Sequence, residues 1–406
     1  MKIYKLKILS LFIFLTIYST VNISGQAVKT AAKDSTGIQQ IDVVDIFQLL
    51  LLKELRTDSA EMKDNGPFFS LIPVIGYSLH TGLTGVIASS TTFYSDAKRK
   101  KNSRILVNAN YSIYHQYWFT AISNIFLEKR KLHLVGDTRY YKFPTQTYGL
   151  GPDSKSSNPL QIDYSYLRFY QVAFREIVPN LFVGLGYNLD YHWNIEVDSV
   201  KGKNLDQFEK YQNGNKSVSS GFSLNIQYDD RKNAVNPQNG TYANIQVKPK
   251  LIFLGSNKNW QSVLIDIRHY MNVPVSSHNI LAFWSYNVIT LSGNPPYLDL
   301  PSIGWDNYST TGRGYAQGRY TGRNLLYLET EYRFSITRNG LLGGVIFGNA
   351  ESVPNSISDN IQSVIPAGGL GLRIKINKFS GTNLAIDYGF GIRGSHGFFF
   401  NMGEVF

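Results

Sequence analysis

Residues 382–393 read TNLAIDYGFGIR, and residues 397–406, the last of the sequence, read GFFFNMGEVF. In the first stretch apolar side chains occupy every second position, at Leu384, Ile386, Tyr388, Phe390 and Ile392. Small or polar residues lie between them, at Ala385, Asp387, Gly389, Gly391 and Arg393. A period of two is that of a β-strand. An apolar face opposite a polar one predicts a strand with lipid on one side and a polar lumen on the other.

The second stretch alternates in the same way and ends on an aromatic residue. This ending is typical of the closing strand of an outer-membrane β-barrel, with Phe398, Phe400 and Phe406 as its signal residues. A transmembrane helix needs ~18–20 apolar residues, whereas a barrel strand needs only ~9–11 with one apolar face. We therefore expect an all-β fold, a transmembrane antiparallel β-barrel with a short N-terminal helical extension.

The alternation recurs upstream, where ionisable side chains share one face of each stretch. Glu329, Glu331 and Arg333 lie on one face of residues 326–334, and Arg373 and Lys375 on one face of residues 370–376. A barrel places such a face in its lumen. About sixteen strands are predicted, near 68–79, 83–94, 104–115, 117–128, 132–143, 163–175, 181–193, 217–229, 241–253, 260–272, 279–290, 323–335, 341–350, 363–377, 382–394 and 397–406.

Connection lengths agree with this count. The longest gaps between predicted strands are 144–162, 194–216, 291–322 and 351–362, and all are odd-numbered connections, so all lie on one side of the membrane. Short turns on one side and long loops on the other are typical of such barrels. Residues 95–103 and 230–240 are the exceptions, because both are longer than the turns expected on their side.

Three segments are predicted along the chain. Residues 1–25 resemble a secretory signal, with Lys2, Lys5 and Lys7 before a short apolar stretch and cleavage after Gly25 or Ala27; a membrane anchor is the alternative. Residues 26–66 form a short periplasmic extension with a helix at 41–55, which either packs under or inside the barrel or binds a partner. Residues 67–406 form the barrel.

Composition narrows the function classes. The 406 residues include no cysteine, so neither disulfides nor thiolate metal sites are available, and 14% are aromatic, as the girdles of a membrane barrel require. The net charge is +11, but Lys and Arg are scattered apart from one run at 98–101, so no nucleic-acid partner is expected. The seven His lie singly, and no catalytic motif is present. We expect no enzyme activity, cofactor or metal.

Residues 310–324, in the eleventh connection and therefore the sixth outer loop, read TTGRGYAQGRYTGRN. Arg313, Gly314 and Tyr315, followed by Glu331 on the next strand, resemble the loop-six motif of the outer-membrane assembly and secretion superfamily of BamA, TamA and FhaC. Three further stretches resemble that superfamily and its bacterial surface antigen members, namely residues 148–151 (YGLG), residues 228–240 (YDDRKNAVNPQNG) and the terminal strand.

The resemblance implies that the loop folds back into the lumen, where Glu331 pairs with Arg313. The family usually has Phe-x-Asp on the thirteenth strand, and this chain has Phe347 and Asn349. An amide in place of the second carboxylate is expected to weaken the charge balance by one. A glycine-rich outer loop without a role in the lumen is the alternative.

The family also carries periplasmic POTRA modules, and residues 26–66 are too few for one, so a barrel-only member is expected. By resemblance, the chain assists insertion or translocation of outer-membrane or surface proteins in the bacterial outer membrane. The partners expected are the lipid bilayer, unfolded outer-membrane protein clients, and a periplasmic subunit or a second copy. The alternative is a passive channel or structural barrel, since fold does not fix function.

Overall fold

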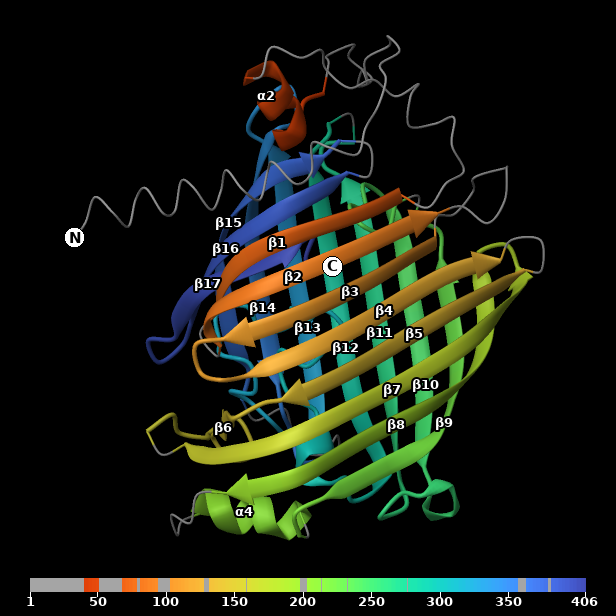
Figure 1. Cartoon of the computed structure of the whole chain (residues 1–406), viewed down its shortest axis with the longest axis vertical. Helices are drawn as coiled ribbons and strands as arrows, with labels where there is room; N and C mark the ends of the chain where they lie inside the picture. The colour runs from red at the N-terminus through yellow and green to blue at the C-terminus, as the bar shows by residue number, and fades with distance from the viewer. Residues whose placement is uncertain are drawn as a thin grey trace.

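The computed structural model describes residues 40–50, 68–78, 81–93, 103–127, 131–157, 159–197, 203–212, 214–231, 233–275, 277–356, 363–378 and 381–406. Within them one 17-stranded sheet curves into a barrel (Figure 1). The chain reaches the barrel through α2 (Val43–Leu50), and the first half of the wall is built from β1 (Phe68–Ser78), β2 (Gly82–Phe93), β3 (Ser103–Ser112), β4 (Tyr117–Leu127), β5 (Leu132–Lys142), β6 (Thr145–Thr147), β7 (Leu160–Val178), β8 (Leu181–Val197) and β9 (Ser217–Asp229). The other elements are α4 (Lys203–Tyr211), β10 (Gly240–Lys250), η3 (Ile252–Leu254), β11 (Trp260–Asn272), β12 (Ile280–Gly293), η4 (Tyr297–Asp299), β13 (Asn324–Ser335), β14 (Leu342–Ser352), β15 (Ile365–Asn377), β16 (Thr382–Gly391) and β17 (His396–Met402).

The predicted barrel is confirmed, and each of the sixteen predicted strands corresponds to one long strand. Each long strand pairs antiparallel with the next, from Phe68↔Thr92 in the first hairpin to Phe390↔His396 in the last. The three-residue strand β6, which pairs with the start of β7, was not predicted. The last strand is also shorter than predicted, because β17 ends at Met402 and not at Phe406.

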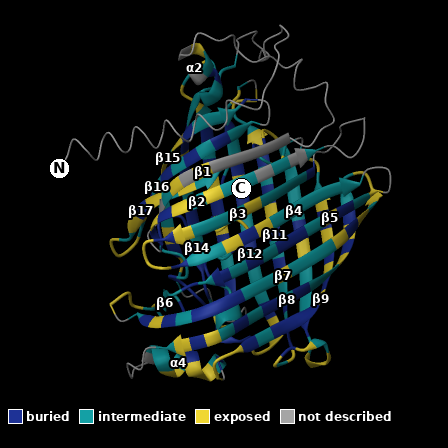
Figure 2. Cartoon of the chain, in the orientation of Figure 1, coloured by how far each residue is buried: buried dark blue, intermediate teal, exposed yellow. Residues whose placement is uncertain are grey.

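Burial is inverted relative to a water-soluble sheet protein. Side chains that point away from the lumen are apolar and exposed, among them Leu185, Leu224, Leu328, Leu370 and Phe390. Side chains that point inward are charged and buried, among them Arg139, Asp190, Lys250, Glu331 and Asp387. Figure 2 shows exposed and buried residues alternating along the strands. An apolar outer belt around a polar interior is the arrangement that a lipid bilayer requires of a barrel.

The barrel has two different ends, named here by their helices. The long odd-numbered connections lie at the α4 end, as predicted, and include α4 and the segment around β6 (Figure 1). The short turns lie at the opposite end, the α2 end. Of the two exceptions to the length rule, residues 230–240 belong to the α2 end, where β10 already begins at Gly240, and residues 95–102 lie outside the described part of the chain.

Helix α2 is the described part of the helix predicted at 41–55. The amide of Ile41 donates to the Asn339 carbonyl at 3.1 Å, and Asp45 pairs with the Lys378 ammonium at 2.8 Å. These contacts place α2 against the turns that follow β13 and β15, so it packs under the barrel. The predicted signal at 1–25 and most of the extension at 26–66 lie outside the described residues. No helix among the described residues is long and apolar enough to cross a bilayer.

The barrel closes where β17 lies beside β1 (Figure 1). Among the described residues, hydrogen-bonded ladders join every other pair of neighbouring long strands, but none joins β1 to β17. Pro73 lies in the middle of β1. Because proline has no N–H to donate to a ladder, it is found within sheets mainly on edge strands, at strand starts and at bulges. We refer to the β1–β17 junction as the seam.

Candidate functional site: the loop-six cluster

Residues 294–323, which connect β12 to β13 and are called loop six here, turn back into the lumen. Ile303, Tyr315 and Tyr320 of the loop are almost fully buried against inner-wall residues of β11 to β15. Asp306 shapes the turn before the tip, since its carboxylate accepts hydrogen bonds from the Thr310 amide at 2.9 Å and the Thr311 amide at 2.8 Å. The tip is therefore formed inside the barrel.

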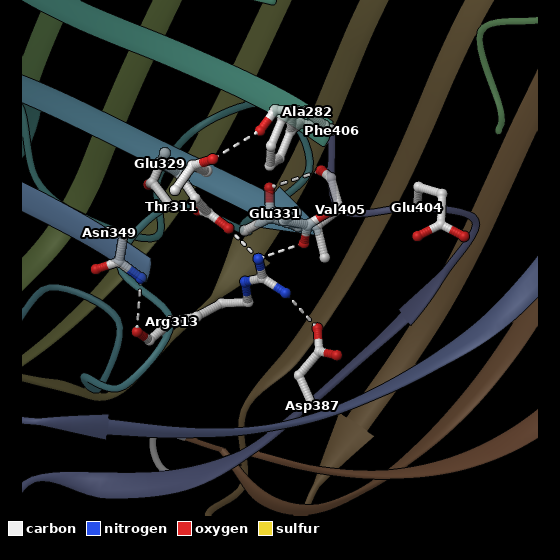
Figure 3. Close-up of polar contacts among 12 residues, drawn as sticks. Ala282, Thr311, Arg313, Glu329, Glu331, Asn349, Asp387, Glu404, Val405 and Phe406 are labelled. Carbon is white, nitrogen blue, oxygen red and sulfur yellow. Dashed lines mark hydrogen bonds and ion pairs between the residues drawn. The ribbon is translucent and has the colours of Figure 1, made fainter. Parts of the chain in front are cut away.

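Arg313 lies at this tip with a side chain only 1% exposed (Figure 3). Its Nη1 donates to Oδ2 of Asp387 at 2.6 Å, and its Nη2 contacts both Glu329 and Glu331. Three carboxylates from two strands therefore surround one guanidinium. Because an unpaired charge in a desolvated site costs several kcal/mol, this pairing is what allows the arginine to be buried.

Two residues of β14 complete the pocket around the arginine. The guanidinium carbon lies 3.7 Å from the centre of the Phe347 ring, a cation–π contact. The side-chain amide of Asn349 donates to the backbone carbonyl of Arg313 at 2.9 Å. Asn349 therefore holds the backbone of the tip. The expectation that this amide leaves the site one carboxylate short is wrong, because Glu329 and Asp387 supply the negative charge.

The tip fits against β16 because two wall residues are glycines. Gly314 has a φ of +112°, which favours glycine, and its carbonyl accepts a hydrogen bond from the Ser395 hydroxyl at 2.7 Å. The Tyr315 hydroxyl donates to the Pro366 carbonyl at 2.6 Å and accepts from the Ile392 amide at 2.9 Å. A Cβ at Gly391 would lie 2.3 Å from the Tyr315 ring, and one at Gly389 would lie 2.7 Å from the Gly314 nitrogen.

The charges continue beyond Arg313 into a network that we call the loop-six cluster. It contains three arginines and four carboxylates, namely Arg313, Arg333, Arg373, Glu329, Glu331, Asp387 and Glu404. Arg333 donates to Glu331 at 2.7 Å, and Arg373 donates to Asp387 at 2.5 Å and to Glu404 at 2.8 Å. The cluster therefore joins the loop, three wall strands and the end of the chain.

Residues 403–406 leave the sheet and enter the lumen. Gly403 has a φ of +100°, and beyond it Val405 and Phe406 are almost fully buried. The Phe406 ring stacks on Trp284, with centroids 5.1 Å apart. The backbone carbonyl of Phe406 accepts a hydrogen bond from Arg333 at 3.0 Å. The prediction that Phe406 ends the closing strand is therefore wrong, whereas Phe398 and Phe400 do lie on the exposed face of β17.

Residues 148–151 and 228–240, the two other stretches that resemble the superfamily, contact loop six and the segment 403–406, respectively. In residues 148–151, the Gly151 amide donates to the carbonyl of Thr321 in loop six at 2.9 Å. In residues 228–240, Arg231 pairs with Asp229 at 2.9 Å, and the Val235 carbonyl accepts the Glu404 amide at 3.2 Å. One stretch therefore supports loop six at the α4 end, and the other supports the lumenal segment 403–406 at the α2 end.

Beside loop six the lumen retains a cavity of about 190 Å³ facing β7 to β12. Asp299 of η4 lines it, accepts a hydrogen bond from the Ser219 hydroxyl at 2.5 Å and lies 3.7 Å from His192. Burial, with the negative charge of Asp190 nearby, raises the pKa of Asp299 to about 7. Within the described residues no group of three or more metal-ligating side chains is arranged to hold a metal ion.

The structure brings together all six residues named for the loop from the sequence, namely Arg313, Gly314, Tyr315, Glu331, Phe347 and Asn349. Sequence reasoning missed the roles of Asp387, Gly389, Gly391 and Glu404. Alternation had assigned Asp387 to the lumen face, so the signal for that residue was present but not used.

No protein-family model and no curated protein sequence matches the chain. Solved structures do resemble it. BamA from Haemophilus ducreyi lacking POTRA domains 1–3 matches with a TM-score of 0.52 and 14% identity over 83% of this chain and 69% of that one. CdiB from Acinetobacter baumannii matches with a TM-score of 0.51 and 12% identity over 93% and 73%. CdiB from Escherichia coli matches with a TM-score of 0.50 and 12% identity over 82% and 67%. The chain has the barrel fold of these proteins.

Proposed function

We propose that this barrel lies in the bacterial outer membrane and assists the insertion or translocation of other outer-membrane or surface proteins. The observation that supports this most directly is the seam, where β1 and β17 lie side by side without a ladder. An unpaired strand edge is a template on which an extended client segment can pair by β-augmentation. The proposal is also supported by the barrel fold that this chain shares with BamA and CdiB.

Loop six supports this role over that of a passive channel. A loop anchored in the lumen by a buried arginine occupies space that an open pore would leave to water. The same anchor stabilises the wall strands β13 and β16 while the seam remains unpaired. Clients would reach the seam from the α2 end, delivered by a periplasmic subunit or by a second copy.

The test is reconstitution of the purified protein in lipid vesicles, with folding of an unfolded outer-membrane protein timed by its gel mobility. Ion conductance is recorded on the same vesicles, and vesicles with an unrelated barrel of similar size are the control. We expect faster client insertion with little steady conductance. Steady conductance with no effect on client folding would replace the proposal with the passive-channel function.

A further inference from the structure

The lumen cavity beside loop six is lined by two cations that can accept an anion. Lys248 of β10 lies 5.8 Å from the centre of the Tyr170 ring, and among the described residues its ammonium makes neither a hydrogen bond nor an ion pair. Arg168 of β7 lies over the same ring at 4.8 Å. Its Nε donates to the Tyr166 hydroxyl, whereas its two Nη atoms make no hydrogen bond to the described part of the chain. An ammonium and the edge of a guanidinium therefore lie around one tyrosine.

The nearby carboxylates of the wall have other partners. Asp137 accepts two hydrogen bonds from Arg139, at 2.6 and 2.8 Å, and lies 3.7 Å from Nη1 of Arg168. Asp190 accepts from the Lys250 ammonium at 3.1 Å and from two tyrosine hydroxyls at 2.7 and 2.5 Å. A cation without an anionic partner in a narrow, partly desolvated lumen is unfavourable, so an oxyanion bound beside it would be stabilised.

The other side of the cavity has groups that can bind hydroxyls. Oδ1 of Asp299, on η4, makes no hydrogen bond to the described residues and lies 3.7 Å from Nδ1 of His192. The side-chain nitrogen of Asn188 lines the cavity and, in the same part of the chain, has no hydrogen-bond partner. Asp306 of loop six is engaged by amides of its own loop. Asp299 and Asn188 thus offer an acceptor and a donor, which are the two groups that a ligand hydroxyl can use.

The anion-binding and hydroxyl-binding groups belong to one place. Ser219 connects them, since its hydroxyl donates to Asp299 at 2.5 Å and its carbonyl accepts from the Lys250 ammonium at 3.2 Å. Lys250 in turn lies 5.2 Å from the centre of the Tyr170 ring, the ring that Lys248 also faces. One small ligand can therefore contact both sets.

The size and the lining of the cavity favour a polar ring as the ligand. Its volume of about 190 Å³ exceeds the roughly 150 Å³ that is sufficient for benzene. Tyr286 lines it from the wall and Trp305 from loop six. The C–H faces of a sugar ring are apolar and pack on aromatic rings, whereas its hydroxyls need hydrogen-bond partners. A single sugar ring meets both conditions.

We propose that this cavity binds an acidic monosaccharide, a single sugar ring that bears a carboxylate. The carboxylate lies between Lys248 and Arg168, and the hydroxyls bond to Asp299 and Asn188. The site does not involve the seam, so this inference goes beyond the proposed function and does not rest on it.

The test titrates the purified protein in detergent micelles with glucuronate, glucose, glucosamine and inorganic phosphate at equal ionic strength. Tryptophan fluorescence reports binding, because Trp260 and Trp305 line the cavity. We expect glucuronate to bind at least about tenfold more tightly than glucose, because only glucuronate pairs with the two cations. Glucosamine, which is a cation, should bind more weakly than glucose, and phosphate, which has no ring, more weakly than glucuronate.

Lys248→Gln removes the charge and should bring the affinity for glucuronate close to that for glucose. Lys375→Gln, on the lumen face of β15 and not among the residues that line the cavity, is the matched control and should bind glucuronate like wild type. Unchanged glucuronate binding by Lys248→Gln would overturn the proposal.

The wild-type titrations decide the matter even if Lys248→Gln does not fold. Absence of saturable glucuronate binding, or equal binding of glucuronate and glucose, would overturn the proposal. Phosphate bound as tightly as glucuronate would overturn the assignment to a sugar.

Discussion

The Nη1 atom of Arg313 lies 2.6 Å from Oδ2 of Asp387, a residue 74 positions further along the chain. This contact joins loop six to β16, the strand that pairs with β17 on the side away from the seam. Asp387 also accepts from Arg373, which in turn pairs with Glu404. The position of the loop, the strand next to β17 and the segment 403–406 are therefore linked by one set of buried charges.

Removing the guanidinium should destabilise the barrel. Arg313→Ala leaves Glu329, Glu331 and Asp387 buried without this cation, and breaking a buried pair costs about 3–5 kcal/mol. We expect a lower urea concentration at the unfolding midpoint. We also expect the compact form seen on gels to be lost after heating to a lower temperature than for wild type. Arg323→Ala, in the same loop and donating to Asn294 and Gly293 near the surface, is the control and should behave like wild type. An Arg313→Ala protein with wild-type heat resistance would remove the anchoring role.

Filling the space beside Tyr315 should displace the loop while the barrel remains closed. Gly391→Ala places a methyl group where the Tyr315 ring lies, and such overpacking costs about 1–3 kcal/mol. The tip must move, so we expect higher ion conductance across vesicles together with a modest loss of stability. Gly85→Ala adds the same methyl with its nearest neighbour 4.0 Å away and is the control. Equal conductance in the two variants would show that the tip does not occlude the lumen.

Stability should depend on pH through Asp299. Burial raises the pKa of this carboxyl to about 7, above its value in the unfolded chain, so the folded protein binds more protons between these values. The contribution of Asp299 is therefore fully present below about pH 4 and is lost as pH rises through 7. The change is on the order of 2–4 kcal/mol.

Urea unfolding at pH 5 and pH 8.5 measures this effect. Asp190, His192, Lys250 and Arg168 face the same group, so wild type and Asp299→Asn are compared at each pH. Asn keeps the oxygen that accepts from Ser219 but does not ionise. We expect the variant to lose most of the pH dependence. A variant with the same pH dependence as wild type would assign it to other groups.

The sequence was sufficient to predict the barrel because alternation is a local property. Each strand showed its lumen face by itself, and that is how Glu329, Glu331 and Asp387 were placed correctly. The partners of Arg313 were predicted only in part, because Glu331 follows from the strand next to the loop, whereas including Asp387 depends on the distance between β13 and β16 around the barrel. Residues 403–406 were misassigned for a related reason, since their alternation fits a strand and the lumenal site that binds Glu404 and Phe406 is formed by distant strands.

Asn349 gives a prediction that runs against the resemblance to the assembly superfamily, in which an aspartate usually lies at this position. Here the amide nitrogen donates to the Arg313 carbonyl at 2.9 Å, and Asp387 already supplies the carboxylate. Asn349→Asp would replace this donor with an oxygen facing a carbonyl and add a fourth carboxylate around Arg313. A buried carbonyl that loses its donor costs about 1–3 kcal/mol, so the variant should be less stable than wild type in urea.

Asn294→Asp is the matched control for this prediction. Asn294 is exposed in the same loop and accepts from Arg323 through its side-chain oxygen, so an aspartate there keeps its hydrogen bond. We expect the control to unfold like wild type. A gain in stability for Asn349→Asp would mean that the site is short of negative charge after all. The amide would then be a compromise at this position, and its hydrogen bond to the tip would not be what holds the backbone of Arg313.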